Sequence, residues 1–235
     1  MSAPSPCPEL LRLDPAAETE RIVAAIQDSV RRRFRRGGAV VAVSGGIDSG
    51  VVAALCVRAL GPQRVLALLL PEAESSPDSL RLGRALVGSL GVESIVEDIT
   101  PILQGARCYE RRDAAIRLVI PDYRSGDKCK IVLPNLVEAD RYALFSIVVE
   151  SPDGQTRSAR LSAEAYLGIV AATNFKQRAR KMLEYYYADL RQYAVAGTPN
   201  RLEYDQGFFV KLGDGAADFK PIAHLYKTQV YQLAA

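Results

Sequence analysis

The chain has 235 residues, of which 49% are hydrophobic and 24% charged, a composition typical of a soluble globular protein. Its net charge of +3 is too small to indicate nucleic-acid binding, and its longest apolar run, Val65–Leu70, is far shorter than the roughly 18 residues of a membrane helix. The first residues, MSAPSPCPEL, contain no apolar signal-peptide core, so a cytoplasmic location is the default expectation. Four scattered cysteines without a CxxC pair and a single histidine, His224, argue against a zinc site, so we expect reduced thiols. The single histidine also argues against a Ser-His-Asp or Cys-His nucleophile.

Residues 1–16 are rich in proline, alanine and serine and are predicted to form a flexible arm. Hydrophobic residues then recur every fourth position and share one face of a predicted helix. They are Ile22, Ile26, Val30 and Phe34. The run RRRFRR at residues 31–36 could bind nucleic acid, but cations at a helix end also complement the helix dipole, so we interpret it as a solvated helix end.

The most informative segment is SGGIDSG, residues 44–50, between an apolar strand and a helical stretch. Its glycines, Gly45 and Gly46, let the main chain approach a ligand, and the amides that open the helix favour an anion. The turn lacks the lysine of a Walker A motif and carries Asp48 instead. A carboxylate beside phosphates requires a cation between them, so Asp48 is predicted to bind magnesium.

Strands and helices alternate along this part of the chain. The predicted strands are Ala39–Val43, Val65–Leu70 and Val92–Ile99, and the predicted helices are Val51–Leu60 and Pro77 to about Leu90. Ser76 is predicted to cap the start of the second helix, and Gly91 to end it. Such alternation predicts a doubly wound, mostly parallel α/β sheet whose ligands bind at the carboxyl ends of the strands.

The periodicity weakens over residues 106–166, which we interpret as an insertion containing a β-hairpin around Ser151-Pro152-Asp153-Gly154. Regularity returns at Asn174. A helix is predicted there with a buried stripe and with solvated cations, Lys181 among them, on its other faces. The stripe comprises Phe175, Ala179, Met182, Leu183 and Tyr186. A strand at 193–198 and a final helix from about 225 follow.

The loop SGGxDS resembles the PP-loop of the ATP pyrophosphatases. Together with NFKQRARKMLEYYY and YAVAGTPNRLEYDQGFFVKLGDGAADFKPIAHLYKTQV, it resembles the ammonia-dependent NAD synthetases. The resemblance implies an adenine nucleotide α-hydrolase-like, Rossmann-like domain over residues 17–235. It also implies that a C-terminal segment present in the family is missing here.

The resemblance further implies an ATP-dependent ligase that adenylates the carboxylate of nicotinate adenine dinucleotide (deamido-NAD) and amidates it with ammonia. The roles are carried over residue by residue. ATP would be bound by Ser44, Gly45, Gly46, Ile47, Asp48, Ser49, Thr198 and Lys227; magnesium by Asp48 and Glu203; the dinucleotide by Arg178, Lys211 and Asp218. Asp48 and Lys227 would be catalytic.

The family implies a homodimer. Ammonia would be free or would come from a glutaminase partner, because the chain has no glutaminase domain of its own. Three alternatives stay open: an amide ligase for another carboxylate, a PP-loop tRNA-modifying enzyme supported only by residues 31–36, and a non-catalytic nucleotide-binding protein. The residues do not decide whether the insertion is a lid, a docking element or a decorative loop.

Overall fold

The computed structural model describes residues 8–133 and 145–235. Residues 1–7 of the predicted arm, including Cys7, and residues 134–144 of the predicted insertion lie outside the described residues. The chain forms two compact units. The first comprises Met1–Thr100 and Gln177–Ala235, and the second comprises Pro101–Lys176.

A parallel sheet with strand order β3-β2-β1-β7 forms the centre of the first unit. Its strands are β1 (Ala39–Ala42), β2 (Val65–Leu69), β3 (Glu93–Val96) and β7 (Ala194–Ala196). β1 pairs with β2 on one side and with β7 on the other. The segments that leave the carboxyl ends of β1 and β7 therefore start side by side, where doubly wound folds bind ligands.

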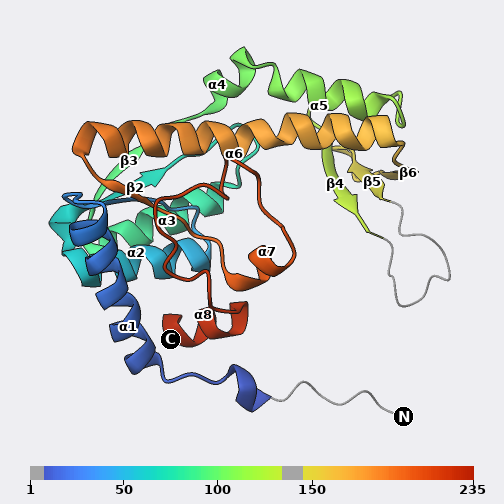
Figure 1. Ribbon diagram of the computed structural model, residues 1–235. Helices are drawn as coiled ribbons and strands as arrows, with labels where there is room; N and C mark the ends of the chain where they lie inside the picture. Colours follow the sequence, from blue (N-terminus) through green and yellow to red (C-terminus); the bar gives the residue numbers. More distant parts are fainter. Residues whose placement is uncertain (1–7, 134–144) are drawn as a thin grey trace, which may run out of the picture. The chain divides into compact units, whose positions relative to one another are not determined.

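Helices cover both faces of this sheet, and Figure 1 shows α2 and α3 on one face and the C-terminal part of α6 on the other. The helical segments are η1 (Pro8–Leu11), α1 (Pro15–Gln27), η2 (Asp28–Arg33), α2 (Ile47–Leu60), η3 (Pro62–Arg64), α3 (Pro77–Leu90), α6 (Ala163–Arg191), α7 (Arg201–Asp205) and α8 (Lys227–Ala234). The predicted ends of α3 are confirmed: Ser76 caps its first turn, and Gly91 ends it in the left-handed conformation. The doubly wound parallel fold is thus confirmed.

The hydrophobic stripe of the N-terminal helix is confirmed up to Val30, whereas Phe34 is 39% exposed. Residues 28–33 form the π-helical segment η2. A π-helical turn contains more residues than an α-helical one, so a spacing of four no longer keeps a side chain on the same face.

The prediction for α6 is partly wrong. The helix begins at Ala163, well before Asn174. Ala179 and Leu183 are buried, but Met182 and Tyr186 are 55% and 56% exposed, and Lys181 is buried with its Nζ 2.6 Å from Glu184 Oε2. Successive helical residues differ by about 100° in direction, so Lys181 and Leu183 lie on nearly opposite faces of α6. Both of these faces are buried, and Met182 lies between them on an exposed side.

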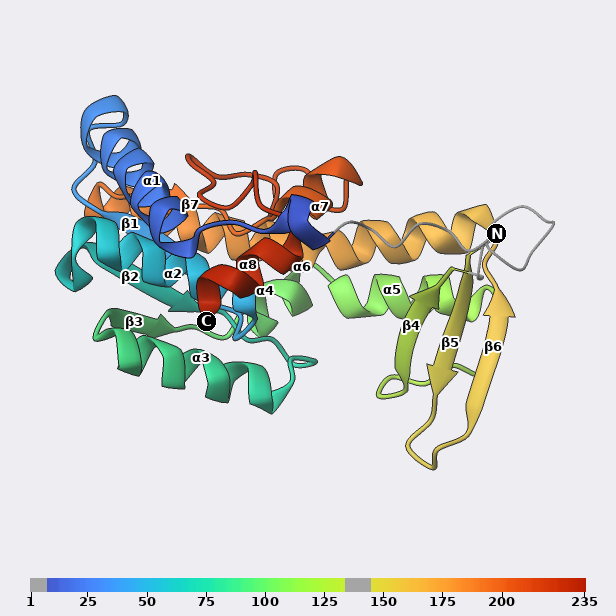
Figure 2. The ribbon, with the colours of Figure 1, turned by 90° about the horizontal axis from the view of Figure 1, so that it is seen from below.

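The second unit contains an antiparallel sheet of order β4-β5-β6, whose strands lie side by side in Figure 2. Its strands are β4 (Lys128–Val132), β5 (Ser146–Glu150) and β6 (Thr156–Arg160), and its helices include α4 (Thr100–Gly105) and α5 (Cys108–Arg117). The predicted hairpin is confirmed as β5 and β6, with Ser146 paired to Arg160. Helix α5 was not predicted from the sequence: half of its positions are charged, so its apolar face is narrow.

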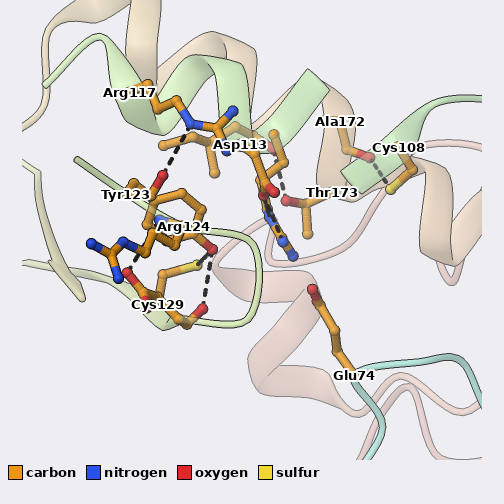
Figure 3. Close-up of polar contacts among 12 residues, drawn as sticks. Glu74, Cys108, Asp113, Arg117, Tyr123, Arg124, Cys129, Ala172 and Thr173 are labelled. Carbon is orange, nitrogen blue, oxygen red and sulfur yellow. Dashed lines mark hydrogen bonds and ion pairs between the residues drawn. The ribbon is translucent and has the colours of Figure 1, made fainter. Parts of the chain in front are cut away.

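Polar contacts within the second unit tie α5 to the chain that follows it (Figure 3). Arg117 Nε donates to the carbonyl of Tyr123 at 3.0 Å, and the Tyr123 hydroxyl donates to the carbonyl of Asp127 at 3.1 Å. Among the described residues, Cys56, Cys108 and Cys129 are not in disulfide bonds, and burial raises the pKa of Cys56 to about 12. Across residues 8–133 and 145–235, no helix has the length and hydrophobicity to cross a membrane.

Candidate active site

The glycine-rich turn lies at the carboxyl end of β1 and leads directly into α2. Gly45 has φ +83°, and a Cβ at this position would lie 2.5 Å from the carbonyl oxygen of Ser79. Both its conformation and its contact with α3 therefore require glycine. Gly46 occupies the N-cap of α2, and no side chain caps that helix, so the helix start is open to an anion.

The two serines of the turn stabilise it from within. Ser49 is buried; its hydroxyl donates to the carbonyl of Gly46 at 2.9 Å and accepts from the amide of Ser44 at 3.2 Å. The Ser44 hydroxyl lies 3.2 Å from that of Ser49 and is on the exposed side of the turn. Ser44 is thus the more accessible of the two predicted phosphate donors.

Asp48, Glu203 and Lys227 come together from three separate segments. Asp48 lies in the first turn of α2, and its Oδ2 forms an ion pair with Lys227 Nζ at the start of α8. Its Oδ1 accepts from Asn200 Nδ2 at 3.4 Å. Burial, followed by the nearby charge of Asp48, raises the pKa of Glu203, so the two carboxylates are electrostatic neighbours.

Asn200 connects the members of this cluster and was not among the predicted site residues. It follows β7, is 4% exposed, and accepts from the amides of Leu202 and Glu203 as the N-cap of α7. Glu203 completes a capping box by accepting from the amide of Asn200 at 2.8 Å. The spacing N-x-x-E is a helix-start signal that could have identified the cap, although not its contact with Asp48.

Of the three residues predicted to bind the dinucleotide, only Arg178 and Lys211 are in contact with each other. Arg178 Nε donates to the carbonyl of Lys211 at 3.2 Å, and both side chains are exposed. Asp218 instead accepts from the amide of Val195 in β7 at 2.7 Å and from the hydroxyl of Tyr185 at 3.4 Å. Thr198 lies in the segment after β7, partly exposed.

A cavity of about 250 Å³ adjoins the turn at the carboxyl ends of β1 and β2. Its walls include Ser44, Leu69, Pro71 and Gln177, and Arg180 Nε donates to the carbonyl of Leu70 at its edge, 3.2 Å away. An apolar slot with peptide groups at its rim suits a flat heteroaromatic ring. The residues that line this cavity come from segments far apart in the chain, so the cavity could not be predicted from the sequence.

A parallel sheet, an uncapped helix start after a glycine turn, and paired carboxylates at the same edge define a nucleotide-binding protein of the doubly wound α/β class. The chain belongs to the NAD synthase family, whose model matches residues 18–119 and 148–235. The predicted membership is confirmed.

Relatives agree with this assignment. The chain is 57% identical to an NH(3)-dependent NAD(+) synthetase of Mesorhizobium japonicum over 96% of this chain and 70% of the relative, and 56% identical to one of Rhizobium meliloti over 96% and 67%. Among solved structures, it is similar to the NH3-dependent NAD synthetase of Campylobacter jejuni, with a TM-score of 0.65 and 28% identity over 94% of this chain and 72% of that chain.

Proposed function

We propose that this chain is an ATP-dependent ligase that adenylates the carboxylate of nicotinate adenine dinucleotide and then amidates it with ammonia, giving NAD, AMP and pyrophosphate. The observation that carries the proposal is the convergence of Asp48, Glu203 and Lys227 beside the glycine turn. These groups have the charges needed to bind a triphosphate and its counter-ion.

In this proposal, ATP places its phosphates on the amides of residues 45–47 and its adenine in the cavity closed by Leu69, Gln177 and Arg180. Ser44, Ser49 and Thr198 add hydroxyls to the phosphate site. Lys227 exchanges Asp48 for a phosphate oxygen and stabilises the departing pyrophosphate.

Two neighbouring carboxylates are the hard oxygen donors that magnesium prefers, so Asp48 and Glu203 fit that ion. When bound, it would neutralise charge on the phosphates of ATP. The raised pKa of Glu203 is consistent with this role, because a cation between the carboxylates would remove their repulsion.

The substrate carboxylate would attack the α-phosphorus of ATP, and ammonia would then displace AMP from the acyl-adenylate. No protein nucleophile is needed, since orientation of two bound reactants alone can contribute about 7–11 kcal/mol. Arg178 and Lys211 would bind the anionic dinucleotide, while Asp218 would contact it from the end of β7. Because the relatives above are NH(3)-dependent synthetases, we propose free ammonia rather than a glutaminase partner as the nitrogen source.

We further propose a homodimer that uses the outward face of α6. Met182, Tyr186 and Leu190 are more than half exposed and, at intervals of four residues, form an apolar stripe. Exposed Phe208 and Leu212 lie on the loop that Arg178 contacts through Lys211. Such an apolar patch is typical of a protein interface. Tyr186→Glu with Leu190→Glu should give a monomer in sedimentation velocity, whereas Leu118→Glu should not.

The decisive experiment measures NAD formation from nicotinate adenine dinucleotide, ammonia, ATP and Mg²⁺. Asp48→Ala should lower the rate by about 10²–10³-fold, the magnitude typical of a lost electrostatic group. Asp78→Ala is the matched control, because Asp78 lies in the first turn of α3 and pairs only with Arg81 among described residues. Wild-type turnover by Asp48→Ala would remove Asp48 from the mechanism, and pyrophosphate release only with another acid would change the acceptor.

A further inference from the structure

The basic segment Arg31–Arg36 contains five arginines and a phenylalanine and takes no part in the proposed reaction. With Asp28, residues 28–36 carry a net charge of +4, whereas the whole chain carries +3. The rest of the protein therefore has a slightly negative net charge. The small net charge of the whole chain includes one strongly positive segment.

Most of this charge is not neutralised locally. Asp28 pairs with Arg33 at 2.9 Å and with Arg32 at 3.9 Å. Within the described chain, Arg31, Arg35 and Arg36 form no ion pair. A helix dipole accounts only for cations in the last turn, and Arg35 and Arg36 lie beyond the end of η2.

The backbone of this segment is fixed on the sheet. Val30 is fully buried, the amide of Arg36 donates to its carbonyl at 2.8 Å, and the amide of Gly37 donates to the carbonyl of Gln192 at 3.0 Å. The arginines therefore project from an ordered base, which lowers the entropy lost when they bind a ligand.

Two aromatic residues and the exposed residue Arg64 belong to this part of the surface. Phe34 is 39% exposed. A Cβ added to Gly37 would lie 3.5 Å from the ring of Tyr193, so this ring lies beside the segment. The main-chain carbonyl of Arg64 lies next to Gly38. Surfaces that bind single-stranded nucleic acid combine cations for the phosphates with aromatic faces for the bases, and guanidinium groups bind phosphate in a bidentate manner.

We propose that residues 31–36, with Arg64 and Tyr193, form a binding surface for single-stranded nucleic acid. The surface precedes β1, whereas the glycine turn follows it, so a strand of four residues, about 13 Å long, separates the two. Binding at this surface is independent of the proposed reaction.

The test is fluorescence anisotropy with labelled 12-mers of oligo(U) and oligo(dT) at several salt concentrations. The triple variant Arg31→Gln/Arg35→Gln/Arg36→Gln should bind at least tenfold more weakly than wild type. Loss of three phosphate contacts should also flatten the slope of log K against log salt by about 2. The control Arg12→Gln/Arg81→Gln/Arg84→Gln removes the same charge from other surface positions and should bind as wild type does.

Phe34→Ala tests stacking separately from charge. It should weaken binding about fivefold or more without changing the salt slope, since stacking of a base on an aromatic ring contributes about 1–3 kcal/mol. Equal losses in the two triple variants, or no salt-sensitive binding by wild type, would overturn the proposal. Heparin or anionic lipid vesicles binding as tightly as the oligonucleotides, with no effect of Phe34→Ala, would make the surface a general anion site and overturn it too.

Discussion

The charge clusters at the two ends of the parallel sheet differ in whether their side chains form ion pairs. At the carboxyl end, Asp48 and Lys227 pair although they are 179 residues apart in the chain. At the amino end, the arginines of residues 31–36 are adjacent in sequence and mostly lack acidic partners. The charged side chains that the fold brings together from distant segments form an ion pair. The arginines that are consecutive in the sequence mostly form none within the described chain.

The charge cluster of Asp48 and Lys227 at the carboxyl end therefore depends on long-range packing, whereas the arginine side chains of residues 31–36 lie on the surface. Substitutions at the carboxyl end should therefore change both activity and stability. Substitutions at the amino end should leave the fold nearly unaffected.

The largest effect is expected for Lys227→Met. Loss of the cation should lower NAD formation by about 10²–10³-fold, because Lys227 is the side chain proposed to stabilise the leaving pyrophosphate. Lys128→Met, which removes an exposed lysine in β4, should keep wild-type activity. A retained rate in Lys227→Met would mean that its pairing with Asp48 is structural only.

Gly45→Ala should destabilise the fold by roughly 2–4 kcal/mol in urea denaturation. The new Cβ would combine an unfavourable positive φ with a clash against Ser79. Gly88→Ala is the control, because a Cβ there meets nothing within 4 Å and alanine favours the helix by about 0.5–1 kcal/mol. Equal stability of the two variants would show that the turn can relax.

Asn200→Ala should cost about 1 kcal/mol, the usual effect of a lost N-cap. Asn200→Asp keeps an N-cap acceptor but places another carboxylate beside Asp48. A further carboxylate attracts the cation, so we expect Asn200→Asp to retain most of the stability while lowering the magnesium concentration needed for half-maximal activity. If both variants behave alike in that titration, the contact with Asp48 has no bearing on the metal.

The smallest effect concerns the amino end of β3, where Arg191 forms two hydrogen bonds with Glu93 at 2.9 and 2.5 Å. These bonds lower the pKa of Glu93 from its ordinary 4.5. Their stabilisation is complete above pH 4.5 and is lost as pH falls through the folded-state value. Since the pair is exposed, Glu93→Gln should cost only about 0.5 kcal/mol at pH 7 and nothing near pH 2. A double-mutant cycle with Arg191→Gln would measure this term, and a coupling that persists at pH 2 would contradict it.

The sequence alone determined the alternation of strands and helices, the caps Ser76 and Gly91, and the glycine turn before α2. These features depend on local backbone chemistry and on hydrophobic periodicity, both of which are readable over a few residues. The resemblance carried by the same motifs also led to the family.

Tertiary structure alone decided which charges meet. The pairing of Asp48 with Lys227, the cap formed by Asn200 and the cavity beside Arg180 each join segments that are far apart in the chain. It also decided which sides of α6 are buried: Leu183 and Lys181, on nearly opposite faces of the helix, are both buried, whereas Met182 between them is exposed. Periodicity shows that a helix has an apolar face, but only the neighbouring elements select which residues line it.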